Sequence, residues 1–165
     1  KMKRTLSDRE SAARWVDPEL WHVTLQFLGN LEGARLTQLE HAFHSWKPSF
    51  PELKLELQGL GAFPTATQAR ALWVGVHSTQ AFFDLQSNLT AHFSAAGFAG
   101  DGREFRPHLT LARLRNPQSV SDLVGLGGRK SFGEYAVEEA VLFESVLQGQ
   151  MPKYIPLIRR PLGHQ

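Results

Sequence analysis

Two short stretches of the sequence each place a histidine and a threonine two residues apart inside an apolar run. The stretches are ELWHVTLQFLGN and FRPHLTLARLR, and their polar members are His22 with Thr24 and His108 with Thr110. In an extended strand, residues i and i+2 point to the same face, about 7 Å apart. Each stretch therefore predicts an imidazole and a hydroxyl presented together, and Arg113 just beyond the second motif adds a candidate cation.

Two histidines and two hydroxyls suit the in-line displacement of one ester of a phosphate diester. A neutral histidine can take a proton from the attacking water while a protonated histidine delivers one to the departing oxygen. The ordinary histidine pKa of about 6.5 lets both forms coexist near neutrality. The phosphate oxygens gain charge as the reaction proceeds, and we expect Thr24, Thr110 and Arg113 to stabilise them.

A single His-x-Thr motif carries little information, because a histidine on a half-buried strand is more often structural. Here the two motifs also share leucines at identical offsets, Leu25 with Leu111 and Leu28 with Leu114. A matching pattern on two strands favours one active site assembled from both. The remaining structural alternative is a duplicated core strand that never carried chemistry.

Hydrophobic spacing predicts the elements that must position these motifs. Residues 19–28 alternate, with Val23, Leu25 and Phe27 on the face opposite His22 and Thr24. Similar patterns predict strands at 52–60, 70–78, 105–115, 135–147 and 154–158, and helices at 33–46, 82–96 and 120–126. Most connections are too short for parallel crossovers, so we expect an α+β arrangement with antiparallel or mixed sheets.

The composition excludes several classes of protein. The 165 residues suit a single domain of two lobes, and the absence of cysteine excludes disulfides and thiol chemistry. No apolar run is long enough for a membrane helix and no secretory signal is recognisable, so we expect a cytoplasmic protein without a membrane partner. The net charge of +2 permits a phosphate-bearing partner. No convincing set of metal ligands is present, and no cofactor is expected.

The paired motifs HVTLQFLG and RPHLTLAR resemble the signatures of the two-histidine (2H) phosphoesterases. Within that superfamily, the chain resembles the RNA 2',3'-cyclic phosphodiesterases, formerly called 2'-5' RNA ligases. Further matching stretches are GAFPTATQARALWVGV (61–76), GFAGDGREFRPHLTLAR (97–113) and LFESVLQGQMPKYIPL (142–157). The resemblance extends over nearly the whole chain from Arg14 onward.

This resemblance implies a bilobal, pseudo-two-fold α+β fold, with outer helices and a central cleft lined by both motifs. It implies metal-independent opening of a 2',3'-cyclic phosphate at an RNA end to a 2'-phosphate, and the reverse reaction as 2'-5' ligation. It assigns His22 as the acid for the leaving 3' oxygen and His108 as the base for water. Further substrate contacts are expected from Tyr154, Ser145 and Arg70.

Three expectations complete this interpretation. The family usually opens with an apolar strand and a helix, and the fourteen residues before Trp15 contain no such strand, so we expect it to be absent. The domain is expected to act as a monomer on RNA ends or cyclic nucleotides. The alternative function is a non-catalytic module that binds a nucleotide or an RNA end, although recognition alone would not require paired acid and base groups.

Overall fold

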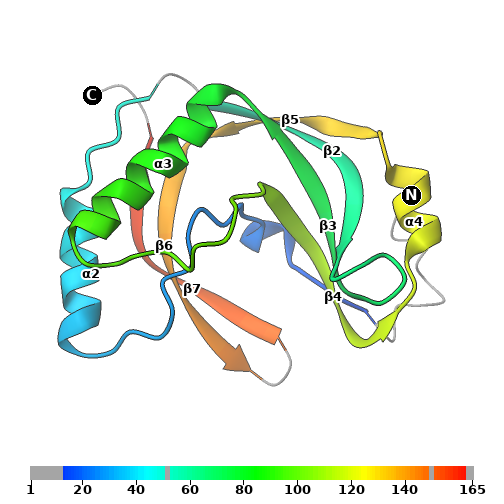
Figure 1. Ribbon diagram of the computed structural model, residues 1–165, viewed down its shortest axis with the longest axis horizontal. Helices are drawn as coiled ribbons and strands as arrows, with labels where there is room; N and C mark the ends of the chain where they lie inside the picture. The colour runs from blue at the N-terminus through cyan, green and yellow to red at the C-terminus, as the bar shows by residue number, and fades with distance from the viewer. Residues whose placement is uncertain (1–12, 51–52, 149–150, 163–165) are drawn as a thin grey trace.

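A computed structural model describes residues 13–50, 53–148 and 151–162 of the chain. Its elements are, in chain order, β1 (Ala13–Trp15), the 3₁₀ turn η2 (Pro18–Leu20), α2 (Ala34–Ser45), β2 (Leu53–Phe63), β3 (Ala69–Ser78), α3 (Gln80–Ala95), β4 (His108–Gln118), α4 (Ser121–Gly127), β5 (Ser131–Val137), β6 (Glu139–Gln148) and β7 (Met151–Pro161). Figure 1 shows a curled sheet with α2 and α3 gathered at one end and α4 at the other.

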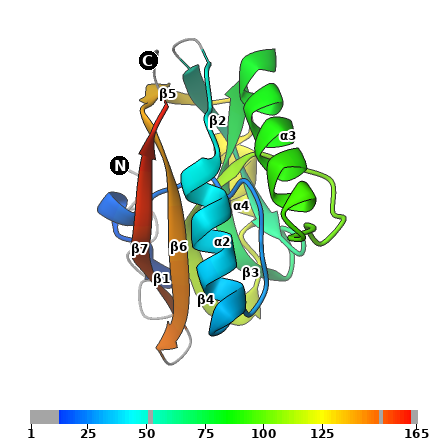
Figure 2. The same cartoon turned by 90° about the vertical axis from the view of Figure 1, so that its left-hand side faces the viewer.

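The strands form two sheets in which every neighbouring pair is antiparallel. Five strands follow the order β1-β4-β3-β2-β5, and β6 pairs with β7 as a separate ribbon. In the side view the β6–β7 ribbon lies on one side of the molecule and α3 on the other (Figure 2). The α+β class with antiparallel sheets and outer helices is therefore confirmed.

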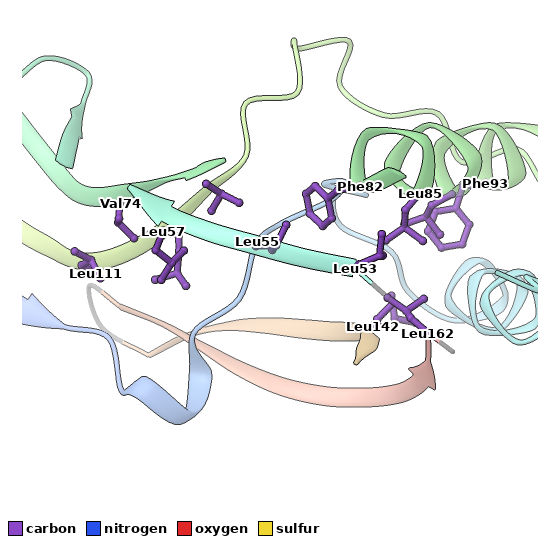
Figure 3. Packing of buried hydrophobic residues seen from close by; sticks show 14 of the residues in the cluster. Leu53, Leu55, Leu57, Val74, Phe82, Leu85, Phe93, Leu111, Leu142 and Leu162 are labelled. Carbon is purple, nitrogen blue, oxygen red and sulfur yellow. The ribbon is translucent and has the colours of Figure 1, made fainter. Parts of the chain in front are cut away.

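The core follows the alternation of β2. Leu53, Leu55 and Leu57 are buried, whereas the residues between them are exposed or half-buried. In Figure 3, Leu53 lies between Leu85 of α3 and Leu142 of β6, and Leu57 lies farther along β2 near Val74 and Leu111. One contiguous apolar cluster thus joins the sheet, the helices and the ribbon, and it gives β3 and β4 a rigid backing.

Two sequence predictions differ from the structure. The segment 19–28 is not a regular strand: it contains part of η2 and then a single bridge between Val23 and Leu109. The predicted strand at 135–147 is two strands, because the chain leaves the five-stranded sheet after Val137 and enters the ribbon at Glu139. The sequence also predicted that an opening strand is absent. Most of the residues concerned, 1–12, lie outside the part of the chain that the structure describes.

In the described part, no helix is both long and apolar enough to cross a membrane.

The buried Leu85 of α3 offers a test of this core. Leu85→Ala leaves a cavity at a fully buried position, so we expect the free energy of unfolding to fall by about 2–5 kcal/mol in denaturant titrations. Leu126→Ala is the matched control, because Leu126 is 74% exposed and its truncation should change stability by less than about 0.5 kcal/mol. Equal effects of the two substitutions would contradict this assignment of the core.

Candidate active site

One backbone bridge brings the two His-x-Thr motifs together. Val23 pairs antiparallel with Leu109, and each of these residues is the central position of its motif. In this register His22 lies across from Thr110, and Thr24 lies across from His108. Directly opposite side chains in an antiparallel pair share a face, with Cβ atoms about 4.5–5.5 Å apart. The two motifs thus form a four-cornered set with a local two-fold relation.

The path of the chain into this bridge explains why the first motif is not a longer strand. β1 runs along one edge of β4, and the Val16 amide donates a hydrogen bond to the Leu111 carbonyl at 2.9 Å. The chain then loops out through η2, where Pro18 suits the first helical position and the Asp17 side chain accepts a hydrogen bond from the Glu19 amide. It returns to the same edge of β4 only at Val23.

Both imidazoles are held in the same way. The Nδ1 atom of His22 lies 2.8 Å from the Leu20 carbonyl oxygen, and that of His108 lies 2.7 Å from the Arg106 carbonyl oxygen. A carbonyl oxygen can only accept, so Nδ1 carries the hydrogen in each ring. In the neutral ring, Nε2 is then the atom with a free lone pair, and in the protonated ring it is the donor. Each histidine therefore offers Nε2 for proton transfer.

Each imidazole also rests against two aromatic rings from the neighbouring strand pair. His108 contacts Phe63 of β2 and Trp73 of β3, with ring centroids 5.1 and 5.9 Å away. His22 contacts Phe143 of β6 at 5.4 Å and Tyr154 of β7 at 4.6 Å. The five-stranded sheet thus supports one histidine and the ribbon supports the other, which extends the two-fold relation beyond the motifs.

A β-bulge brings Arg113 to the same face as the second motif. Strict alternation along β4 would place Arg113 with the core residues Leu109 and Leu111. However, Trp73 pairs with Thr110 and the preceding residue of β3 pairs with Ala112, so Leu111 is an extra residue in the ladder. A bulge of this kind reverses the facing of the residues beyond it. The half-buried Arg113 therefore faces the pocket.

A pocket of about 320 Å³ contains both motifs. Its lining residues are Trp15, Val16, Asp17, Leu20, His22, Thr24, Phe27, His108, Thr110, Arg113, Pro152, Lys153 and Tyr154. Two residues expected as substrate contacts do not line it: Ser145 lies on β6, and Arg70 is exposed on β3. Among the residues that the structure describes, Arg113 has no ion-pair partner and neither threonine hydroxyl makes a hydrogen bond to the protein. These groups are available to an anionic ligand.

Several lining residues were not identified from the sequence. Phe27 was expected to point into the core with Val23 and Leu25, but it is 60% exposed and lines the pocket. Its displacement follows from the irregular backbone of this segment, because alternation holds only in a continuous ladder. Lys153 and Trp15 carry no motif that would have singled them out. The part of the chain described here contains no cluster of three potential metal ligands.

Most of the chain is similar in sequence to known proteins. A model of the 2'-5' RNA ligase superfamily matches residues 7–145. The RNA 2',3'-cyclic phosphodiesterase of Archaeoglobus fulgidus is 32% identical over 87% of this chain and 81% of its own length. The enzyme of the same name from Methanothermobacter thermautotrophicus is 29% identical over 93% of this chain and 85% of its own.

Solved structures give the same picture for the fold. TT0787 of Thermus thermophilus superposes with a TM-score of 0.73 at 25% identity, covering 97% of this chain and 91% of its own. Apo LigT of E. coli superposes with a TM-score of 0.72 at 24% identity, covering 99% of this chain and 89% of its own. These similarities confirm the expected fold.

The substitution Gly61→Ala tests whether Trp73 holds the His108 ring in place. A Cβ atom at Gly61 would lie 2.2 Å from the Trp73 ring, which supports the His108 imidazole. Gly61→Ala should therefore displace Trp73, lower the free energy of unfolding by about 1–3 kcal/mol and shift the NMR signals of the His108 ring.

Gly125→Ala in α4 is the matched control, because no atom beyond the two neighbouring residues and the backbone of its own helix lies within 4 Å of the added methyl group. It should leave the His108 signals unchanged and leave stability the same or higher by up to about 1 kcal/mol. Unchanged His108 signals in Gly61→Ala would show that Trp73 does not position this ring.

Proposed function

Because the chain belongs to the 2'-5' RNA ligase superfamily, we propose that it is an RNA 2',3'-cyclic phosphodiesterase that opens the cyclic phosphate at an RNA end to a 2'-phosphate. One observation carries this proposal: a single pocket contains two histidines that both offer Nε2, two available hydroxyls and a guanidinium without an ion-pair partner among the described residues. The archaeal relatives that bear this enzyme name support it.

In the proposed reaction, water attacks the phosphorus while the bond from phosphorus to the 3' oxygen breaks. Nε2 of a neutral His108 takes a proton from the water, and Nε2 of a protonated His22 gives its proton to the 3' oxygen. The products are a 2'-phosphate and a 3'-hydroxyl, and one proton has passed from the water side to the leaving side. Proton exchange with solvent then restores His22 and His108 to their starting states.

The remaining pocket groups stabilise the charge that develops on the phosphate. The hydroxyls of Thr24 and Thr110, which belong to the four-cornered set of two histidines and two threonines, donate hydrogen bonds to the non-bridging oxygens. The Arg113 guanidinium supplies the positive charge, and it is more effective when half-buried than it would be in open solvent. Phosphate binding thereby provides the partner that Arg113 lacks among the described residues.

The proposal includes catalysis without a metal ion and a reverse reaction. The two imidazoles and the guanidinium together supply proton transfer and charge neutralisation, which are the functions a metal would otherwise serve. In the reverse direction, a 5'-hydroxyl replaces water as the attacking group and yields a 2'-5' linkage. This ligation needs no nucleoside triphosphate, because the strained cyclic ester already activates the phosphate.

Removing either histidine should abolish turnover. His22→Ala and His108→Ala are each expected to lower kcat for adenosine 2',3'-cyclic phosphate by at least about 100-fold, because each removes a proton-transfer group. His77→Ala is the control, since His77 is exposed on β3 outside the pocket lining, and it should keep wild-type kcat. Near-full activity in either pocket variant would exclude the two-histidine mechanism.

The dependence on pH and metal gives a second test. Because one histidine must be neutral and the other protonated, kcat/KM should pass through a maximum and fall on both sides between about pH 5 and pH 9. The same rate should persist after dialysis against EDTA. A flat profile, or activity restored only by a divalent cation, would contradict the mechanism. Binding of the cyclic nucleotide without any turnover would instead identify a non-catalytic module.

A further inference from the structure

A second arginine lies directly beside Arg113 on the same face of the sheet. In the antiparallel register of β1 and β4, Arg14 is the partner of Arg113. Directly opposite residues of an antiparallel pair share a face, with Cβ atoms about 4.5–5.5 Å apart. The next residue of β1 agrees with this facing, because Trp15 packs against the apolar core whereas Arg14 is exposed. Arg14 and Arg113 therefore project from one face of the β1–β4 pair.

Arg115 extends this pair of arginines along β4. Residues i and i+2 of a strand share a face and lie about 7 Å apart. Leu114, which separates the two arginines of β4, packs against the core, and Arg115 is exposed. Arg115 therefore shares the face of Arg113. We call Arg14, Arg113 and Arg115 the arginine cluster.

No ion pair neutralises the arginine cluster within the part of the chain that the structure describes. The ion pairs found there involve other arginines. On the β3 side, the residue opposite Arg113 is Ala71, which carries no charge. The first acidic residue after Arg14 is Asp17, and its carboxylate accepts a hydrogen bond from the Glu19 amide. The cluster is thus a local concentration of positive charge at the edge of the pocket that Arg113 lines.

This charge arrangement is unfavourable for the fold alone. Like charges directly opposite each other in an antiparallel pair are destabilising, and Arg14 and Arg113 form such a pair. A ligand with several phosphates would offset the repulsion, because guanidinium groups form charge-assisted and often bidentate hydrogen bonds with phosphate. The reacting cyclic phosphate carries a single negative charge, which Arg113 alone can balance. Arg14 and Arg115 are therefore in excess of what a cyclic mononucleotide requires.

We propose that the arginine cluster binds the backbone phosphates of the nucleotides that precede the cyclic-phosphate end of an RNA strand. Arg113 holds the reacting phosphate, and Arg14 and Arg115 hold phosphates that lie upstream of it. The upstream side is the only source of further linking phosphates, because the cyclic phosphate closes the other end of the strand. This inference rests on the proposed function, and it makes affinity depend on strand length and backbone charge but not on base sequence.

Binding of the reaction product measures these contacts without turnover. The probes are adenosine 2'-phosphate, a hexaadenylate that ends in a 2'-phosphate, and the same hexaadenylate with uncharged methylphosphonate linkages. Isothermal titration calorimetry gives the affinity of each probe at several salt concentrations. The wild type should bind the charged hexaadenylate more tightly than either of the other probes, since only this probe offers upstream phosphate charges.

Substitutions within the cluster should remove this preference in steps. Arg14→Gln and Arg115→Gln should each reduce the preference for the charged hexaadenylate over adenosine 2'-phosphate by about two- to fivefold at low salt. The slope of log affinity against log salt concentration should become shallower by about 0.7 in each variant, the value for one phosphate contact to a single strand. Arg14→Gln should leave the melting temperature of the free protein unchanged or higher, because it removes a like-charge pair. A lower melting temperature would show that Arg14 supports the fold and would contradict the assignment.

Arg129→Gln is the matched control. It removes the same charge from an exposed position between α4 and β5, outside the pocket lining. This variant should keep the wild-type preference and the wild-type salt dependence. A loss equal to that of the cluster variants would indicate an effect of net charge, and the assignment of the cluster would then be wrong.

The outcomes distinguish this inference from the proposed function. Turnover of adenosine 2',3'-cyclic phosphate is measured on the same preparations. If the wild type turns over this mononucleotide but binds the charged and uncharged hexaadenylates equally, the arginine cluster has no such role and the proposed function stands. If the wild type shows no turnover, the proposed function fails and the inference about the cluster fails with it.

Discussion

The bridge between Val23 and Leu109 is the contact on which the whole site depends. The two residues are far apart in the sequence, and each is flanked by the histidine and the threonine of its own motif. Antiparallel pairing at this point places every histidine opposite the other motif's threonine. A shift of one residue in this register would turn one pair of polar side chains to the opposite face. The register therefore decides whether there is one site or none.

The rest of the molecule supports this register from two sides. β3 pairs with the other edge of β4 and places Trp73 against the His108 ring, while the β6–β7 ribbon places its aromatic residues against His22. The β-bulge at Leu111 turns the Arg113 side chain toward the pocket, because without the bulge Arg113 would face the core. An irregular ladder is thus part of the function, as bulges beside active sites often are.

The sequence predicted the regular parts of this arrangement well and the irregular parts poorly. β2, β3 and α3 follow clear periodic patterns, because continuous ladders and helices impose one facing on each residue. The position of Phe27 depends on a loop, and alternation assigns the wrong face to this residue. Arg113 was expected at the site from its place just beyond the second motif, but its facing depends on the bulge, and alternation alone would turn it toward the core. Lys153 lies in the pocket only because the ribbon packs there, which is a tertiary contact that no local pattern encodes.

The central claim is that two backbone carbonyls fix both imidazoles so that each presents Nε2 to the same phosphate. Long-range ¹⁵N–¹H NMR correlations of the imidazole nitrogens, recorded at a pH where both rings are neutral, test this claim directly. The account predicts that His22 and His108 both carry the hydrogen on Nδ1 and leave Nε2 unprotonated, as their 2.8 and 2.7 Å contacts require. A hydrogen on Nε2 of either neutral ring would contradict it.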